Sequence, residues 1–356
     1  MESTEACKAL MQKGQAQLWQ HIFAFAESMA LKCVVELRVA DIIQSHGVAT
    51  SLSQIAAGID SPSPNIPYLS RIMRLLGRKG IFSAHQSSTS GETLYGLTDV
   101  SRCLLSESEL DQTPLVLMQN HEWVMATWHR LAECVKEGGN AFVKVHGCEL
   151  FDLAAKNPEF NKLFNDAMTC SAKGFARSLV VGYKDGLDSI NGSLMDVGGG
   201  SGELIANIIK EYPHIKGVNC DLPHVIATAP AHKGVSHVEG DMFGALPKAD
   251  AIIMQRILHG FDDEDCIKIL RNCLKAIPKK GGKLIVVDHV RKADGNGAYD
   301  AMGVTIDLLM MTLGTGQGGK QRTAPEWKKL IEKGGFSVQR IIELHNLPSV
   351  IEAFPA

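Results

Sequence analysis

The chain has 356 residues, of which 45% are hydrophobic, and a formal net charge of −3 at pH 7. This composition is typical of a globular protein long enough for two domains, and without a basic excess it gives no reason to expect nucleic-acid binding. No apolar run reaches about 18 residues, so we expect no membrane span. The nine cysteines are scattered and odd in number, and the acidic, polar N-terminus does not resemble a signal peptide, so we expect a cytoplasmic protein.

The N-terminal region, residues 1–110, is predicted to be a small helical domain with a hairpin. Apolar residues recur at helical spacing over Gln15–Val39, and shorter helices are expected at Ser51–Ala57 and Asn65–Lys79. Two strands follow across a polar loop, at Gly80–Ala84 and Thr93–Leu97. This order is typical of a winged helix, but the region carries no basic recognition helix, so we expect it to bind protein rather than nucleic acid.

The remaining chain is predicted to form a helical linker and then an α/β domain. Residues 111–190 are mostly helical, and strands alternate with helices from Ser193 onward. We expect strands at 193–197, 216–220, 249–254, 283–288, 336–343 and 348–353, and helices at 202–211, 224–229, 263–277 and 324–334. This alternation predicts a doubly wound, mostly parallel, Rossmann-like sheet over residues 191–356.

A glycine-rich turn follows the first of these strands. The apolar strand ends at Asp196-Val197, and Gly198, Gly199 and Gly200 come next, before a helical pattern that starts near Gly202. Glycines remove side chains from such a turn, and the following helix directs its first N–H groups at a ligand. Asp221 ends the next apolar run, where an acidic residue is placed to accept both hydroxyls of a ribose. These features predict a nucleoside-cofactor site.

A third loop points to the kind of nucleoside. Asp241 and Met242 lie in the segment Gly240–Phe243, where the acid suits an exocyclic amine and the thioether suits the face of an adenine. The loops at 198–202, 221–222 and 241–243 are all expected at the carboxyl edge of the sheet, where such folds bind ligands. Dinucleotide-binding enzymes separate their glycines by other residues, whereas here three glycines are consecutive. The turn is therefore not typical of a dinucleotide-binding site.

The motifs taken together resemble those of plant small-molecule O-methyltransferases that use S-adenosyl-L-methionine. They occur in the family's order at Asp196–Gly202, Asp221–Val225, Gly240–Phe243, Ile257–His259 and Gly281–Lys283, and the resemblance extends over essentially the whole chain. It implies a methyltransferase fold with an N-terminal dimerisation domain, a homodimer, and a phenolic acceptor of the alkaloid or flavonoid type. The cofactor-binding residues that it implies are Gly198, Gly199, Gly200, Asp221, Leu222, Asp241, Met242, Phe243, Gln255 and Phe261.

His259 is the candidate general base. It follows the apolar strand that precedes it, at the carboxyl edge of the sheet, and a neutral imidazole suits removal of a phenolic proton. The resemblance implies that His259 is the catalytic histidine and that two acids orient it. Asp288 matches the first of these positions, whereas the second is Gln321, which accepts a hydrogen bond but carries no charge.

Further residues near His259 depart from the family pattern. The family's Lys-Trp-Ile-Leu-His-Asp-Trp is Gln255–Phe261 here, so Gln255 replaces a lysine, Gly260 an aspartate and Phe261 a tryptophan. We expect S-adenosylmethionine binding weaker than is usual in the family, and a catalytic function that is relaxed or redirected.

The resemblance also implies an acceptor pocket, which residues 111–190 help to line. Its candidate residues are Met125, Phe151, Met168 and Met310, because methionine and aromatic side chains adapt to flat phenols. No carboxylate cluster with metal-binding spacing is evident, so we expect a metal-independent enzyme. Two alternatives stay open: N-methylation of an amine, which needs a base less, and a catalytically weak subunit that pairs with an active relative in a heterodimer.

Overall fold

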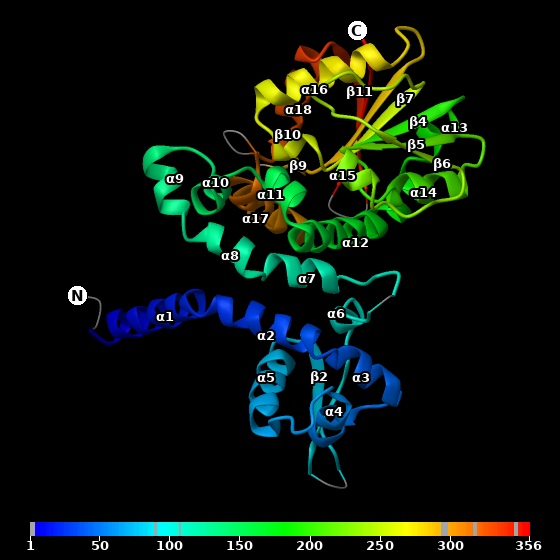
Figure 1. The fold of residues 1–356 in the computed structure, drawn as a ribbon. Coiled ribbons are helices and arrows are strands. Elements are labelled where there is room, and N and C mark those ends of the chain that lie inside the picture. The colour runs from blue at the N-terminus through cyan, green and yellow to red at the C-terminus, as the bar shows by residue number, and fades with distance from the viewer. Residues whose placement is uncertain (1–3, 89–90, 107, 293–297, 316–318, 345–347) are drawn as a thin grey trace. The chain divides into compact units, whose positions relative to one another are not determined.

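The computed structural model describes residues 4–88, 91–106, 108–292, 298–315, 319–344 and 348–356. The chain divides into two compact units, Met1–Asn120 and His121–Ala356 (Figure 1). Each unit is considered by itself. The expected three-part division at residues 110 and 190 stays a prediction.

The first unit consists of short helices around a small sheet. Its elements are α1 (Thr4–Ile22), α2 (Ala24–Glu36), α3 (Val39–His46), β1 (Thr50–Ser51), α4 (Leu52–Gly58), α5 (Ile66–Arg78), β2 (Phe82–Gln86), β3 (Thr93–Leu97), α6 (Asp99–Arg102) and α7 (Thr113–Gln119). The strands pair antiparallel in the order β1-β3-β2. Residues such as Val39, Met73 and Phe82 form its apolar core.

The prediction of one helix over Gln15–Val39 was wrong. The helix breaks at Phe23 and again at Arg38, whose backbone is left-handed with φ of 52°. Helical periodicity of apolar residues continues across both breaks, so the pattern does not reveal them.

Apolar side chains on α1 and α2 remain uncovered in the chain. The exposed fractions of six of them lie between 52% and 71%, at Met11, Leu18, Trp19, Ile22, Phe23 and Phe25. A monomer seldom exposes so many large apolar groups together, so this face is suited to association with protein. Within the described residues, no helix combines the length and apolarity needed to cross a membrane.

The second unit is an α/β domain preceded by helices. The helices before the sheet are α8 (Glu122–Trp128), α9 (Leu131–Glu137), α10 (Ala141–His146), α11 (Leu150–Lys156), α12 (Pro158–Gly182) and α13 (Lys184–Asp188). The alternating part contains β4 (Ser193–Val197), α14 (Glu203–Glu211), β5 (Lys216–Asp221), α15 (Pro223–Ile226), β6 (Val235–Glu239), β7 (Ala251–Gln255), the 3-10 turn η1 (Leu258–Gly260), α16 (Asp263–Ala276) and β8 (Lys283–Asp288). The C-terminal part contains β9 (Val290–Arg291), α17 (Ala298–Leu313), β10 (Arg322–Thr323), α18 (Ala324–Lys333), β11 (Phe336–Glu343) and β12 (Ser349–Pro355).

The main sheet has the strand order β11-β12-β8-β7-β4-β5-β6. From β8 to β6 the pairings are parallel, whereas β12 pairs antiparallel with both β8 and β11. The predicted mostly parallel sheet is therefore confirmed. Strand β6 is absent from the predicted strands, because its sequence Val-Ser-His-Val-Glu has only two apolar residues and it lies at the sheet edge, where no side chain is fully buried.

Helices cover both faces of this sheet, with α16 and α18 on one face and α12 and α14 on the other (Figure 1). Alternate residues of each strand point to opposite faces, so Met195 joins the apolar cluster with α16 and α18 while Leu194 joins the cluster with α14. Helices on both faces bury the parallel strands. Because these strands run in the same direction, their carboxyl ends lie at one edge of the sheet.

Candidate active site

The turn after β4 exposes bare backbone at its tip. Gly198, Gly200 and Gly202 have φ of 74°, 58° and 79°, values that side-chain-bearing residues adopt only with strain. A Cβ on Gly200 would meet no atom within 4 Å, whereas one on Gly199 would lie 2.1 Å from Asn219 Oδ1. Gly199 therefore packs inward, Gly200 leaves room for a ligand, and Gly202 caps the N-terminus of α14.

Asp221 is held beside this turn by two backbone donors. The N–H of Gly200 donates to Asp221 Oδ2 at 2.7 Å, and the N–H of Leu222 donates to Oδ1 at 2.7 Å. Burial raises the pKa of Asp221, and these two hydrogen bonds oppose that rise. Each oxygen keeps a further acceptor position, so the carboxylate is able to receive the two hydroxyls of a ribose.

A second carboxyl group, Asp196, lies beneath the turn and is 2% exposed. Burial, together with the charge of Asp221, raises the pKa of Asp196 to about 8. Asp196 pairs in register with Asn219, and the two atoms Asp196 Oδ2 and Asn219 Oδ1 have no donor among the described residues. A Cβ on Gly199 would approach both. The two oxygens therefore face the same small space beneath the turn, a feature that the sequence motif did not reveal.

An aromatic wall extends from the third loop. Asp241 is exposed, its Oδ1 accepts the N–H of Phe243 at 2.9 Å, and Met242 packs against the core. The ring of Phe243 stands edge-on to Phe261 at 5.5 Å, and Phe261 stacks on Phe151 at 6.4 Å and 15°. The structure thus places Phe151, which was predicted to line the acceptor pocket, against Phe261, which was predicted to bind the cofactor.

Gln255 ends β7, between β4 and β8. Its Nε2 is buried and has no acceptor among the described residues. A buried amide without a partner costs about 1–3 kcal/mol. Gln255 therefore offers an unused donor at the edge where the cofactor loops end.

His259 lies in η1 and is 6% exposed. Its Nδ1 is 3.1 Å from Asp288 Oδ1 and 3.0 Å from Gln321 Nε2. Asp288 is fully buried and also accepts the N–H groups of His289 at 2.8 Å and His259 at 3.3 Å. Burial acts to raise the pKa of Asp288, but His259, the His289 N–H and Arg256 together hold it below its usual value.

The ionised Asp288 decides which His259 nitrogen carries the proton. A carboxylate accepts but does not donate, so Nδ1 must carry the hydrogen and Nε2 the lone pair. An amide nitrogen facing that N–H is unfavourable, and Gln321 Oε1 is otherwise buried without a donor. Exchanging the two ends of the amide lets Oε1 share the Nδ1 hydrogen with Asp288. His259 thereby keeps Nε2 free to accept a proton.

Residues distant in sequence hold this turn in place, and sequence reasoning assigned no role to them. Arg322 is fully buried, and its Nη1 and Nη2 donate to the carbonyls of Leu258 and Phe261 at 3.0 Å each. Asp307 Oδ1 accepts the N–H of Gln321 at 2.6 Å. A Cβ on Gly319 would lie 2.1 Å from the His259 carbonyl, so a glycine is required there. Arg322 directly follows the candidate residue Gln321, and this adjacency was the available signal in the sequence.

Arg256 is a further residue that sequence reasoning left without a role. It has a left-handed backbone with φ of 54°, and its N–H donates to the Val287 carbonyl at 2.9 Å. Its Nη1 donates to Ser171 Oγ at 2.5 Å, and the guanidinium lies 5.9 Å from the centre of the Phe175 ring. Arg256 therefore links the end of β7 to α12.

The predicted acceptor methionines lie on three different helices. Met125 is on α8, Met168 on α12 and Met310, which is 7% exposed, on α17. Helix α17 contacts both α8 and the turn η1 that carries His259. The structure therefore brings two of the three helices together near His259, while the grouping of all three side chains in one pocket stays a prediction.

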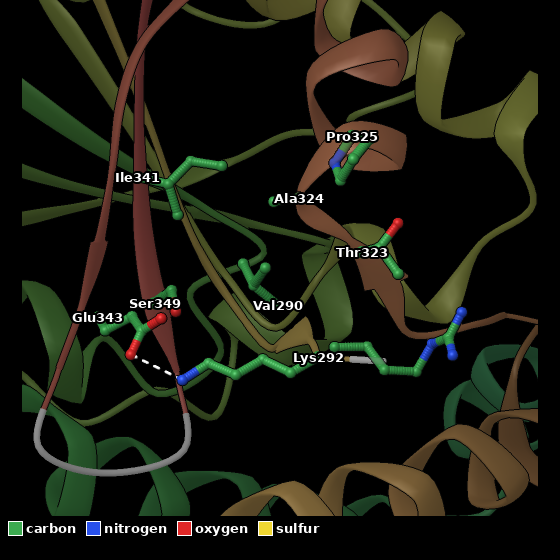
Figure 2. A pocket seen from close by; sticks show the side chains of 9 residues that line it. Val290, Lys292, Thr323, Ala324, Pro325, Ile341, Glu343 and Ser349 are labelled. Atoms are coloured by element: carbon green, nitrogen blue, oxygen red, sulfur yellow. Dashed lines mark hydrogen bonds and ion pairs between the residues drawn. The ribbon is translucent and has the colours of Figure 1, made fainter. Parts of the chain in front are cut away.

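One cavity lies beside the β9–β10 pair (Figure 2). It is lined by Val290, Arg291, Lys292, Thr323, Ala324, Pro325, Ile341, Glu343 and Ser349. Lys292 Nζ and Glu343 Oε2 form an ion pair at 2.8 Å within it (Figure 2). None of the predicted site residues lines this cavity. In the part of the chain that the structure describes, no cluster of three or more His, Cys, Asp or Glu side chains is arranged to hold a metal ion.

Comparison with protein families matches both parts of the chain. Residues 128–337 match the O-methyltransferase domain, and residues 19–107 match the O-methyltransferase dimerisation domain.

Similar proteins are known from plants and from solved structures. The chain is 49% identical to desmethylxanthohumol 6'-O-methyltransferase from Humulus lupulus and 48% identical to (R,S)-reticuline 7-O-methyltransferase from Papaver somniferum, in each case over 96% of this chain and 98% of the relative. The SAH-bound calicheamicin-biosynthesis methyltransferase CalO1 is 26% identical over 97% of this chain and 99% of its own, with a TM-score of 0.80. Human N-acetylserotonin methyltransferase, in complex with SAM, shares the fold over 96% of this chain and 98% of its own, with a TM-score of 0.84 at 22% identity.

Proposed function

The chain belongs to the family of S-adenosylmethionine-dependent O-methyltransferases, and we propose that it methylates a phenolic hydroxyl of a multi-ring plant metabolite with His259 as the general base. The observation that supports this proposal most is the contact of His259 Nδ1 with the buried Asp288, which leaves Nε2 as the proton acceptor. The names of the plant relatives support an alkaloid or flavonoid acceptor.

The residues of the sheet edge suit the cofactor. Gly200 offers open backbone, Asp221 offers two anchored carboxylate oxygens, and Gln255 has an unused buried donor. Asp241, Met242, Phe243 and Phe261 supply an acid and flat side chains for the adenine end, and Gly198, Gly199 and Leu222 shape the turn around it. The bound cofactor supplies an electrophilic methyl group on its sulfonium.

The affinity for this cofactor is expected to be weaker than is usual in the family, because Gln255 carries no charge where the family has a lysine. Calorimetric titration measures it directly. A sub-micromolar dissociation constant would contradict this expectation.

Proton removal falls to His259. A phenol has a pKa near 10, so at neutral pH the hydroxyl needs a base to become a good nucleophile. Asp288 fixes the imidazole and stabilises the positive charge that it gains, whereas Gln321 orients it without contributing charge. Met125, Met168 and Met310 are proposed to hold the flat acceptor rings, with Phe151 shared between this pocket and the aromatic wall.

The apolar face of α1 and α2, within the matched dimerisation domain, supports a homodimer. We also propose a cytoplasmic location, supported by the odd number of scattered cysteines. Imaging of a fluorescent fusion tests the location, and sedimentation tests the dimer.

Incubation with methyl-labelled S-adenosylmethionine and a panel of phenols and amines tests the activity. We expect label on a phenolic oxygen, located by mass spectrometry. Label on nitrogen would instead support N-methylation, which the uncharged Gly260 and Gln321 favour. Absence of any transfer, combined with stable pairing to a related methyltransferase, would support a subunit of a heterodimer.

A further inference from the structure

The side chain of Arg256 is fixed on a defined face of α12. Its partners there, Ser171 and Phe175, follow Met168 at positions i+3 and i+7, so the three residues share one face of the helix. Ser171 is buried at 6% exposure and bonds to the guanidinium. Arg256 therefore places a permanent positive charge on the helix face that carries a proposed acceptor-lining residue.

The backbone of Arg256 indicates that this placement is constrained. A left-handed conformation is unfavourable for an arginine relative to ordinary backbone. Such strain persists where the surroundings enforce it, and it is concentrated at functional sites. Here the bond to Val287 and the bond to Ser171 hold the residue from both sides.

The charge of Asp288 acts on Arg256 from a distance, but no direct ion pair joins Arg256 to a carboxylate among the described residues. Asp288 contacts His259, and Asp307 binds the backbone of Gln321, whereas the guanidinium of Arg322 is paired with Asp263. Gln321 itself is neutral and Gly260 has no side chain. The neighbourhood of His259 therefore contains one cation that no direct carboxylate contact neutralises among the described residues, and that cation is Arg256.

We propose that Arg256 determines acceptor specificity by charge, so that the site favours uncharged phenols and phenolates over phenols that carry a protonated amine. The inference rests on the proposed function, since it concerns the acceptor of that same site. The plant relatives, at 48% and 49% identity, do not separate these two acceptor classes, whereas the charge of Arg256 does. At an effective dielectric near 20, the repulsion between two like charges roughly 10 Å apart weakens binding of the charged ligand by about tenfold.

The experiment compares two ligands with the same phenolic rings and different charge. Reticuline carries a protonated tertiary amine at neutral pH, and N-acetylnorreticuline carries an uncharged amide in its place. Calorimetry measures the dissociation constant of each for the full-length protein loaded with S-adenosylhomocysteine. We expect the wild type to bind the uncharged ligand more tightly, and Arg256→Gln to reduce that preference by about tenfold.

Two matched variants separate charge from packing. Arg256→Lys retains the charge, and Ser171→Ala removes the hydrogen bond while leaving the guanidinium, so we expect both to keep the wild-type preference. An unchanged preference in Arg256→Gln, or an equal loss in all three variants, would overturn the proposal. Because binding is measured without turnover, a wild type that binds these ligands but methylates no phenol would contradict the proposed function alone.

Discussion

In the proposed active site, the cofactor side and the base side are built from different parts of the chain. On the cofactor side the turn Gly198–Gly202 presents backbone groups, and one acid, Asp221, is anchored by two of its neighbours' N–H groups. On the base side, His259, Asp288 and Gln321 are side chains from three separate segments, and 62 positions separate the first from the last. A site made of local backbone depends on the conformation of one turn, whereas a site made of distant side chains depends on the packing that brings them together.

The largest effect is expected on the base side. We expect His259→Ala to lower kcat by about 10²–10⁴-fold, because the phenolic proton loses its acceptor. Steady-state kinetics with the preferred phenol measures it. The dissociation constant of S-adenosylhomocysteine serves as the control and should stay near the wild-type value. A retained kcat would mean that proximity alone drives transfer.

On the cofactor side, we expect the largest loss of cofactor affinity from Gly199→Ala, which adds one methyl group. Gly199→Ala forces a Cβ against Asn219 Oδ1 and Asp196 Oδ2, and overpacking of this kind costs roughly 1–3 kcal/mol. We expect the dissociation constant of S-adenosylhomocysteine to rise by about ten- to a hundredfold in calorimetry.

Gly260→Ala is the matched control, because a Cβ there meets no atom within 4 Å. We expect cofactor affinity to be unchanged in that variant. Equal losses of cofactor affinity in Gly199→Ala and Gly260→Ala would show that the cofactor side and the base side are not independent.

Restoring a negative charge at position 321 should change catalysis on the base side and leave cofactor binding nearly unchanged. Gln321→Glu places a second carboxylate at His259 Nδ1 and stabilises the imidazolium that forms during transfer. We expect kcat to rise by about three- to tenfold with little change in cofactor affinity. Gln321→Leu, of similar size and without hydrogen bonds, should lower kcat. An unchanged or lower kcat in Gln321→Glu would indicate that the glutamine is adapted to its acceptor.

The smallest expected effect concerns stability on the cofactor side. The pKa of Asp196 is about 8 in the folded chain and near 3.8 when unfolded. Between these values the folded state keeps a proton that the unfolded state has lost, so stability falls as pH rises toward 8. We expect the thermal midpoint of Asp196→Asn to fall less between pH 6 and pH 8 than that of the wild type, as scanning calorimetry measures. Parallel curves for the two proteins would contradict the buried protonated acid.

Much of the fold followed from local patterns. The apolar runs at 193–197 and 283–288 became β4 and β8, and the glycine turn between β4 and α14 has the expected strand–turn–helix form. The failures also have local reasons. The edge strand β6 lacks an apolar run, and the breaks at Phe23 and Arg38 interrupt a helix whose apolar periodicity continues across them.

By itself, the sequence determined the order of most of the elements and the position of a tight strand–helix turn, because glycines reach the positive φ values that such a turn needs. Only the tertiary structure decided what surrounds His259. Three hydrogen bonds depend on how the strand ends and helices pack. They join His259 to Gln321, Arg322 to the Leu258 carbonyl in η1, and Arg256 to Ser171 on α12. Hydrogen bonds between side chains far apart in sequence have no local pattern, so they become visible only when packing brings their partners together.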